Sequence, residues 1–504
     1  MKKVFISLVI LAGLLPMWSC SLKEDPNGYV SPYSFFSSKA QCRAAVNGCY
    51  NPLNYIHNLK YLIALEGATD LGATNNSAQP DSKFEINPAN PGAAVIVWRQ
   101  SWRGVGYCLS TLAGIDRSTK LTESEKTPYI AETRVLLAYY YYVLTSFFGD
   151  VPFYETYIET DEDMYLVGRL PRVSATQIRQ TLIEELKHWT PLLPQVRTCD
   201  QENHYNYCGA AMGWMVMAKM AAWDKDWDTV LMACGHLEDI YGDLNQYPYS
   251  DVCFRNKNTA ESIFEINHEF QEGGIDYVTG EGLPCGTILL PYPKTNGEAI
   301  FDGVTIPELG KDTYCYQPIR PTKYMKDNVA PAGVGDIRRE YNISTGWNGV
   351  KFNGSRSWMG QKFWCFGMLR NNDSNNYKIF RYADAILLQA EAWCEKGDFA
   401  KSVAYLNKVR ERAQITLYSF VSEVKLRGEI RDERARELFG EFNRKYDLVR
   451  WGIWYDQVSE FNTYGAAVKN IRPCHQFYPI PDVQCSRTGR VLSNPEYDKY
   501  NLSN

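Results

Sequence analysis

Two stretches of the sequence repeat one pattern, a helix rich in small residues, a tight turn and a second helix with apolar residues at three- and four-residue spacing. They occupy residues 209–240 and 382–413. Each places an acidic and an aromatic residue at the turn, Asp226-Trp227 in the first and Asp398-Phe399 in the second. Small residues let two helices approach closely, and the apolar spacing gives the second helix one buried face. The pattern predicts two antiparallel helical hairpins.

The hairpin pattern resembles the tetratricopeptide helix–turn–helix unit. In that interpretation the aromatic residue at each turn fills the gap between neighbouring hairpins. The two copies are imperfect, and two unrelated pairs of antiparallel helices are the alternative. We expect the tetratricopeptide-like hairpins to be distributed across residues 123–242 and 377–454.

Helical periodicity also dominates the first half of the chain. Apolar residues recur at three and four positions in residues 38–50 and 123–148. The longer segment is followed by Gly149 and Pro152, a glycine cap and then a proline. Residues 173–189 open with Ser174, which is a favourable N-cap. The predicted fold class is therefore mostly α.

Residues 251–375 have a different composition. Glycine and proline account for 22 of these 125 residues, and polar loops alternate with short β-like runs such as residues 262–266. A structureless loop of this length is rare inside a folded domain, so we expect an ordered, irregular insert. The scaffold is predicted at about residues 38–250 and 376–504.

The N-terminal residues have the pattern of an export signal. Lys2 and Lys3 precede an apolar run at residues 4–15, which has the length of a signal-peptide core. Ser19-Cys20 follows and resembles a bacterial lipoprotein lipobox, although Pro16 and Met17 depart from its usual leucine. The resemblance implies removal of residues 1–19 and lipidation of Cys20, leaving residues 20–504 as one domain. An ordinary secretory signal is the alternative.

Composition and absent motifs narrow the function. With 53 basic and 58 acidic residues the net charge is −5, which gives no footprint for nucleic-acid binding. The 14 cysteines contain no CxxC pair, and no HExxH, GxSxG or phosphate-loop motif occurs. The run Asp161-Glu162-Asp163 is interpreted as a solvated loop. We therefore expect no catalytic residue, no metal and no cofactor.

The aromatic content is unusually high. Aromatic residues make up 14% of the chain, with 35 Tyr and 13 Trp. Most are expected to pack in the core, but so large a surplus also favours rings that stack on a ligand.

Several motifs resemble the SusD/RagB family, the surface nutrient-binding lipoproteins of Bacteroidetes. They occur in family order and comprise residues 138–152, 381–392, 406–413, 432–451, 478–481 and 494–497. Glu496 departs from the glycine usual in the family, and the order Gly440-Glu441 is reversed. The acidic start after the lipobox, Lys23-Glu24-Asp25, resembles the surface-export signal of such lipoproteins.

These motifs have a structural interpretation of their own. Glu433, Glu437 and Glu441 follow helical spacing, which makes ion pairs with Arg436 and Arg444 available. A catalytic role for these glutamates is the less favoured interpretation. Tyr478-Pro479-Ile480-Pro481 predicts a rigid extended segment laid across the helices.

The family resemblance implies a function. It predicts a cell-surface protein, lipid-anchored to the outer membrane, that captures an oligosaccharide and delivers it to a SusC-like TonB-dependent transporter. A peptide-binding member of the same family is the second hypothesis. A surface glycoside hydrolase is the third, and no carboxylate pair in a recognisable setting supports it.

Sugar binding requires flat aromatic rings beside hydrogen-bonding side chains. The insert offers this mixture, and so does the region of residues 70–102. The candidate ligand-binding residues are Trp347, Trp358, Trp364, Tyr277 and Tyr292 in the insert, and Asn75, Asn76 and Trp98 in the second region. Trp98 and Trp102 are four residues apart in an apparent helix, so at least one of them is expected to be buried.

Overall fold

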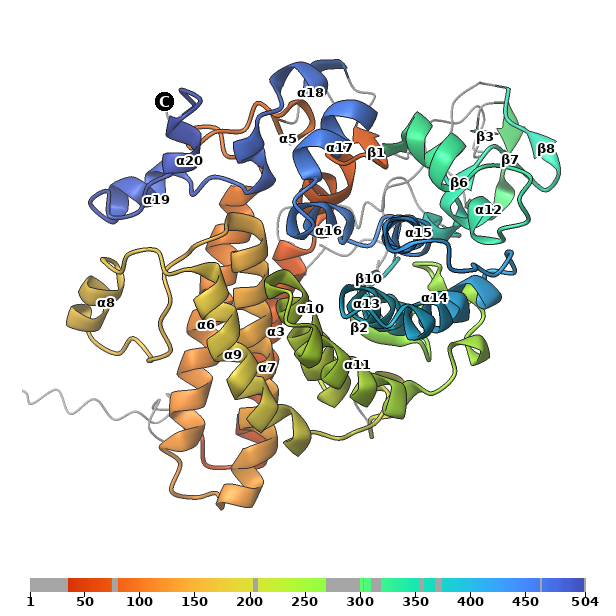
Figure 1. Ribbon diagram of the computed structural model, residues 1–504. Coiled ribbons are helices and arrows are strands. Elements are labelled where there is room, and N and C mark those ends of the chain that lie inside the picture. Colours follow the sequence, from red (N-terminus) through yellow and green to blue (C-terminus); the bar gives the residue numbers. More distant parts are fainter. Residues whose placement is uncertain are drawn as a thin grey trace, which may run out of the picture.

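The structure is a computed structural model. It describes residues 35–74, 80–202, 207–268, 300–301, 303–309, 319–353, 358–367, 374–462 and 465–502. As the sequence predicts, the described residues are mostly helical, and the strands are short. Figure 1 shows the helices arranged side by side, with the loop-rich segment and its strands gathered at one side.

Four long helices form the first half of the scaffold. They are α3 (Lys39–Ile56), α6 (Ala94–Asp116), α7 (Glu123–Phe148) and α9 (Ala175–Trp189), and each packs against the next. The predicted bounds of α7 are those observed, and Gly149 ends the helix with a φ of 74°. Ser174 stands at the N-cap of α9, although its side chain makes no capping hydrogen bond.

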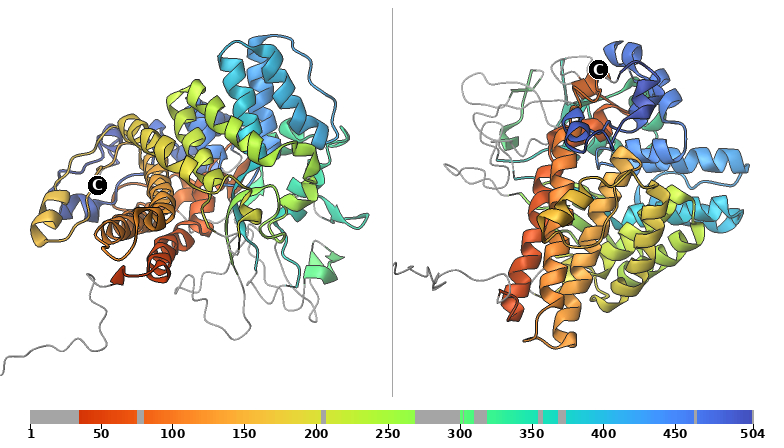
Figure 2. Two further views of the ribbon diagram at one scale, coloured as in Figure 1. Left: turned by 90° about the horizontal axis from the view of Figure 1, so that it is seen from below. Right: turned by 90° about the vertical axis from the view of Figure 1, so that its left-hand side faces the viewer.

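The two predicted hairpins are present. The first pairs α10 (Ala210–Asp224) with α11 (Trp227–Tyr241), and the second pairs α13 (Tyr382–Glu395) with α14 (Phe399–Arg412). Helix α11 packs against α13, so two units separated by about 140 residues of sequence are direct neighbours, as Figures 1 and 2 both show.

The acidic residue at each hairpin turn has a definite role. The Asp226 carboxylate accepts a hydrogen bond from the backbone N–H of Thr229 at 3.2 Å. The Asp398 carboxylate accepts one from Lys401 at 3.1 Å in the same way. Both acids therefore cap the second helix of their hairpin, where backbone donors lack partners within the helix.

Helices α7 and α10 lie at the centre of the molecule. From Ala210 to Ala222 every side chain of α10 is buried, and α7 is buried almost continuously from Ala131 to Phe148. A helix that is apolar around its whole circumference must be surrounded by other elements. This burial follows from the sequence, because α10 is rich in alanine and methionine and α7 contains a run of tyrosines.

The strands form five antiparallel pairs among the described residues. These are β1 (Gly72–Thr74) with β5 (Ile319–Pro321), β2 (Ser262–Ile266) with β10 (Tyr377–Arg381), β3 (Ile300–Phe301) with β4 (Val304–Thr305), β6 (Ile343–Ser344) with β9 (Trp358–Met359), and β7 (Gly346–Trp347) with β8 (Val350–Lys351). The pair of β1 with β5 ties the insert to the N-terminal helices. Gly72 is required in it, because a Cβ there would stand 2.3 Å from the carbonyl oxygen of Glu66.

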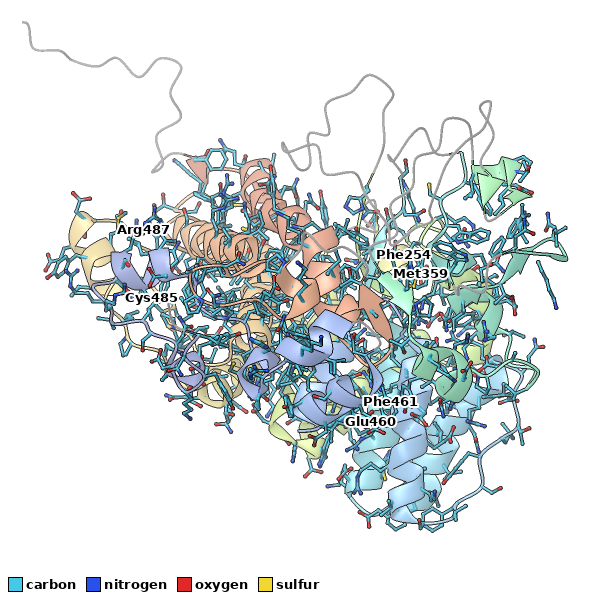
Figure 3. The ribbon with its side chains drawn as sticks, turned by 90° about the horizontal axis from the view of Figure 1, so that it is seen from above. Phe254, Met359, Glu460, Phe461, Cys485 and Arg487 are labelled. Atoms are coloured by element: carbon cyan, nitrogen blue, oxygen red, sulfur yellow. The ribbon has the colours of Figure 1, made fainter. Side chains whose placement is uncertain are left out.

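The remaining helices connect and cover these elements. They are α4 (Leu59–Leu62), α5 (Pro80–Lys83), α8 (Asp161–Val167), α12 (Arg338–Asn342), α15 (Glu423–Glu437), α16 (Arg444–Arg450), α17 (Trp454–Phe461), α18 (Gly465–Asn470), α19 (Asp482–Arg487) and α20 (Pro495–Asp498). The predicted loop at Asp161-Glu162-Asp163 is instead the first turn of α8, which Thr160 caps. In Figure 3, Cys485 and Arg487 mark α19, which lies at the end of the molecule away from the loop-rich segment.

Buried ion pairs join the scaffold to the insert. The Arg381 guanidinium at the end of β10 contacts the carboxylates of Glu261, Glu437 and Glu441 at 2.7–3.0 Å. Glu441 lies beyond the end of α15, because that helix stops at Glu437 and Gly440 turns the chain with a φ of 77°. The predicted helical position of Glu441 is therefore wrong.

The two predicted arginine partners behave differently. Arg436 pairs with Glu433 at 2.7 Å, as the helical spacing indicates. Arg444 pairs instead with Asp70 at 2.7 Å, a residue far away in the sequence. Because Asp70 precedes β1, this pair fastens the C-terminal helices to the N-terminal half.

The segment from Tyr478 to Pro481 crosses the helices as predicted. The Tyr478 ring stacks on Phe147 of α7 with centroids 4.1 Å apart, and its backbone N–H donates to the Phe147 carbonyl at 2.8 Å. Its hydroxyl donates to the buried carboxylate of Asp81 at 2.8 Å.

None of the helices that the structure describes is both long enough and apolar enough to cross a bilayer.

Candidate functional site

The candidate site is built on two short antiparallel strand pairs in the insert. Strand β6 pairs with β9 so that Ser344 lies opposite Trp358, and β7 pairs with β8 so that Trp347 lies opposite Val350. The connection between β7 and β8 is the two-residue turn Asn348-Gly349, with φ values of 46° and 81°. Asn-Gly is the preferred sequence for such turns, because both positions require positive φ.

A pocket of about 430 Å³ opens against this hairpin. Its walls come from the end of α12, from the β7–β8 hairpin and from the turn Gln361–Phe363 with the residue after it. The lining residues are Glu340, Ser344, Thr345, Gly346, Trp347, Asn348, Gly349, Val350, Lys351, Gln361 and Trp364. The pocket therefore combines indole rings with hydroxyl, amide and charged side chains.

Trp347 is the partly exposed ring of this pocket. Its centroid lies 4.8 Å from that of Trp364, with the planes at 48°, and 6.1 Å from that of Phe366. Trp364 is fully buried, and its indole N–H donates to the Met359 carbonyl at 3.1 Å. The buried ring thus supports the partly exposed one from below.

An acidic side chain holds the exposed indole from the side. The Trp347 indole N–H donates to the Glu308 carboxylate at 3.3 Å, and the Glu308 carbonyl accepts from the backbone N–H of Gly367 at 2.8 Å. Glu308 belongs to the turn Pro307–Leu309, so a separate part of the insert orients the ring.

A cation adjoins the aromatic cluster. The Arg255 guanidinium lies 4.5 Å from the centroid of Phe366, whose side chain is itself exposed, and it donates to the Gln361 carbonyl at 2.6 Å. This arginine fixes the backbone at the pocket wall and widens the surface beyond Trp347.

The pocket rests on a rigid floor. Lys362 is fully buried next to Gln361, where its ammonium contacts Glu441 at 2.5 Å and donates to the Phe439 carbonyl at 2.9 Å. Burial lowers the pKa of Lys362, while Glu441 opposes that shift. In Figure 3, Phe254 and Met359 mark the apolar layer in this loop-rich half, and both side chains are completely buried.

The remaining predicted tryptophans pack in the core. Trp358 is 3% exposed and Trp98 is 6% exposed. Trp98 lies with its ring centroid 5.0 Å from that of Phe148 and 5.5 Å from that of Trp102, so the expected burial within this pair falls on Trp98. Both environments assign these rings to packing.

Five predicted residues lie outside the described part of the chain. They are Tyr277, Tyr292, Asn75, Asn76 and the lipidation candidate Cys20. The structure brings Trp347 and Trp364 together with Asn348.

Sequence reasoning missed most of the polar lining. The sequence motifs do not point to five polar or charged residues that line the pocket: Glu340, Ser344, Thr345, Lys351 and Gln361. The dipeptide Asn348-Gly349 is the signal that leads to them, because it predicts a hairpin that carries Trp347 and Lys351 on opposite strands.

Other hollows and clusters offer less. A pocket of about 200 Å³ lies between residues 328–336 and helices α14 and α15, but its arginines Arg410 and Arg436 are already paired with Glu429 and Glu433. Within the described ranges, no group of three or more His, Cys, Asp or Glu side chains is arranged to hold a metal ion.

The fold and this site define a helical scaffold protein with a loop-borne aromatic pocket. Residues 319–497 match the model of the SusD family. SusD-like protein P25 of Formosa agariphila is 26% identical over 94% of this chain and 95% of its own length. Over most of its length the chain is therefore similar to SusD-like proteins.

Solved structures agree with this fold. Surface glycan-binding protein A from Bacteroides thetaiotaomicron, in complex with laminarihexaose, superposes with a TM-score of 0.71 at 21% identity, covering 91% of this chain and 99% of its own. A laminarin-binding SusD-like protein superposes with a TM-score of 0.70 at 20% identity, covering 91% and 99%.

Proposed function

We propose that this protein is a cell-surface glycan-binding lipoprotein that captures oligosaccharides and passes them to a SusC-like TonB-dependent transporter. The observation that carries the capture step is the partly exposed Trp347 ring, supported by Trp364 and bordered by polar side chains. Sugar rings present apolar C–H faces between hydroxyl groups, so an indole face flanked by amide and hydroxyl groups is complementary to them.

The relatives support the ligand class. One structural neighbour was solved with laminarihexaose, and another is described as laminarin binding. Both names concern glucans, so a glucan oligosaccharide is the first ligand to test on this chain.

The chemistry of the pocket favours binding over hydrolysis. Among its described lining residues, Glu340 is the one carboxylate. Glycoside hydrolysis generally uses a pair of carboxylic acids on either side of the scissile bond. Glu308 supplies a second carboxylate nearby, but that group is engaged with the Trp347 indole.

Isothermal titration calorimetry of the full-length protein tests the proposal. Laminarihexaose is titrated first, then maltohexaose, and then a mixture of hexapeptides. Saturable binding of a hexasaccharide, with no release of shorter sugars during incubation, is the expected result. Binding of the peptide mixture alone would replace the glycan proposal with a peptide-binding function, and accumulation of shorter sugars would indicate a hydrolase.

The proposed location depends on Cys20. Cleavage before this residue and lipidation of its thiol and amine would anchor the body to the outer membrane, where two or more acyl chains give stable attachment. The variant Cys20→Ala should appear in soluble fractions after export, whereas the wild-type protein should sediment with membranes. Membrane retention of the variant would count against the anchor. Co-purification with a transporter of the SusC type from detergent-solubilised membranes tests the partner.

A further inference from the structure

Helix α8 stands on a loop that leaves the body of the molecule between Val151 and Val173, which are joined by an antiparallel bridge. Figure 1 shows this helix apart from the long helices, at one side of the fold. No residue of α8 is buried, and Met164, Tyr165 and Leu166 are each more than half exposed. Adjacent apolar side chains with this exposure mark an interaction surface.

The loop fixes the orientation of α8. Its outgoing arm is fastened at Tyr154, whose ring stacks on Trp102 with centroids 5.6 Å apart. It is fastened again at Glu159, whose carboxylate contacts the Arg117 guanidinium at 2.7 Å. A capping box that begins at Thr160 then starts the helix. The apolar side chains are therefore presented on a preformed element, which a partner binds without first ordering it.

Acidic side chains accompany the apolar ones on α8. Asp161 lies one helical turn before Tyr165, and Glu162 lies one turn before Leu166, so the members of each pair share a face. Residues 155–172 carry five acidic and two basic side chains, a local charge of −3. A complementary surface has apolar hollows with lysine or arginine about 5 Å from them. The same charge is repelled by anionic lipid headgroups, so this surface fits a protein better than a membrane.

The position of α8 relates it to the N-terminal end of the fold. The carbonyl of Phe36 accepts from the Ser118 hydroxyl at 2.5 Å. Arg117, the neighbour of Ser118, pairs with Glu159, which is two residues before α8. Phe36 follows Cys20 by 16 residues, a length of chain that spans at most about 55 Å. An anchor at Cys20 therefore keeps the side of the molecule that carries α8 near the membrane.

We propose that α8 is the surface through which this protein docks on the exposed face of the transporter in the same membrane. The inference rests on the proposed function, which supplies both the anchor and the transporter. Met164, Tyr165 and Leu166 enter an apolar hollow of the transporter. Asp161 and Glu162 pair with basic side chains at the rim of that hollow.

Co-purification from detergent-solubilised outer membranes tests this docking surface. The full-length protein carries an affinity tag, and the accompanying transporter is identified by mass spectrometry and quantified per molecule of tagged protein. Met164→Gln combined with Leu166→Gln should lower this ratio by roughly tenfold, because the apolar contact is lost. The Tm should stay unchanged, because both side chains are exposed. Val421→Gln combined with Val424→Gln alters two exposed valines at the start of α15 and should keep the wild-type ratio.

Two further measurements report on the contact itself. A photo-reactive p-benzoylphenylalanine that replaces Met164 should cross-link to the transporter, and one that replaces Val424 should not. Asp161→Asn combined with Glu162→Gln should weaken the complex and make it less sensitive to salt than the wild-type complex, because exposed charge pairs are screened by salt.

The outcomes distinguish this inference from the proposed function. Absence of a transporter from the wild-type preparation would overturn the delivery step of the proposed function together with the docking surface. A transporter that accompanies the wild type and the α8 variant equally would overturn the docking surface alone, as would a cross-link from position 424 and none from position 164. Binding of the Cys20→Ala protein to vesicles of phosphatidylethanolamine and phosphatidylglycerol, abolished by Leu166→Gln, would assign α8 to lipid and overturn the proposal.

Discussion

The partly exposed ring of Trp347 rests on the fully buried ring of Trp364, with their centroids 4.8 Å apart. The two residues stand in different elements, β7 and the turn after Gln361–Phe363, so folding brings them together. Core packing fixes the orientation of Trp364, and contact with Trp364 in turn fixes the Trp347 ring in place before a ligand binds. Binding then costs little ordering of the platform.

Replacement of Trp347 tests the platform directly. The variant Trp347→Ala should weaken binding of a glycan established for the wild-type protein by about tenfold or more, because a stacking surface that also excludes water is lost. Its Tm should change little, since the ring is partly exposed. Calorimetry and thermal melting measure the two effects separately. Trp358→Phe, at a buried ring outside the pocket, is the control and should keep the affinity. Unchanged binding by Trp347→Ala would place the site elsewhere.

Removal of the supporting ring, Trp364, should lower the stability of the protein, whereas loss of Trp347 should mainly lower its affinity for the glycan. Trp364→Ala takes a completely buried indole out of the core and should destabilise the protein by roughly 3–5 kcal/mol. Chemical denaturation measures this loss. A variant as stable as the wild type would contradict the packing role that we assign to Trp364.

Glu308 should affect affinity through Trp347. The variant Glu308→Ala removes the acceptor of the indole N–H and should weaken glycan binding about fivefold, the value of one hydrogen bond of about 1 kcal/mol. Glu308→Gln keeps an acceptor oxygen and should restore most of the affinity. The double variant with Trp347→Ala distinguishes positioning from a direct contact. If Glu308→Ala still weakens binding in the absence of Trp347, the carboxylate acts on the ligand itself.

The buried carboxylate of Glu437 should be essential to stability. It contacts Arg338, Arg381 and Arg412 at 2.5–3.1 Å with no exposed surface. Burial alone would raise the pKa of Glu437, but the three arginines and Lys362 hold it well below its usual value. Glu437→Gln removes one of the carboxylate partners of each of these buried arginines and should cost roughly 3–5 kcal/mol in urea denaturation. Glu395→Gln removes a partly exposed partner of Arg427 and should cost less than about 1 kcal/mol.

Stability should fall on mild acidification because of His57. Burial lowers the pKa of His57 to about 4, and its ring lies between the Leu53 carbonyl at 2.9 Å and the Tyr139 hydroxyl at 2.7 Å. A carbonyl can only accept, so Nδ1 carries the proton and Nε2 accepts from the tyrosine. The unfolded chain binds its proton near pH 6.5, so between pH 6.5 and 4 it holds more protons than the folded protein.

The resulting change is measurable. His57 should remove about 2 kcal/mol of unfolding free energy between pH 7 and pH 5. His57→Gln should lose this part of the pH dependence in urea denaturation. His188→Gln, at an exposed side chain, should retain the wild-type dependence. An identical slope in wild type and His57→Gln would show that the folded protein tolerates protonated His57.

The sequence by itself determined the helical scaffold, because its signals are local. The periodicity of residues 123–148 and the following glycine set the bounds of α7, and the small residues and capping acids set both hairpins. It also placed Trp347 among the candidates. The positions of Glu441 and Arg444 were beyond it, since their partners Arg381 and Asp70 are distant in the sequence.

Tertiary structure decided which tryptophans face solvent. The same glycine-rich, polar insert carries all three tryptophans, yet Trp347 is partly exposed whereas Trp358 and Trp364 are buried. The difference comes from long-range packing. Strand β9 places Trp358 against β6, and the turn before Trp364 carries that ring beneath Trp347. The residues next to each tryptophan do not reveal whether it is buried, because its burial depends on contacts with elements that are distant in the sequence.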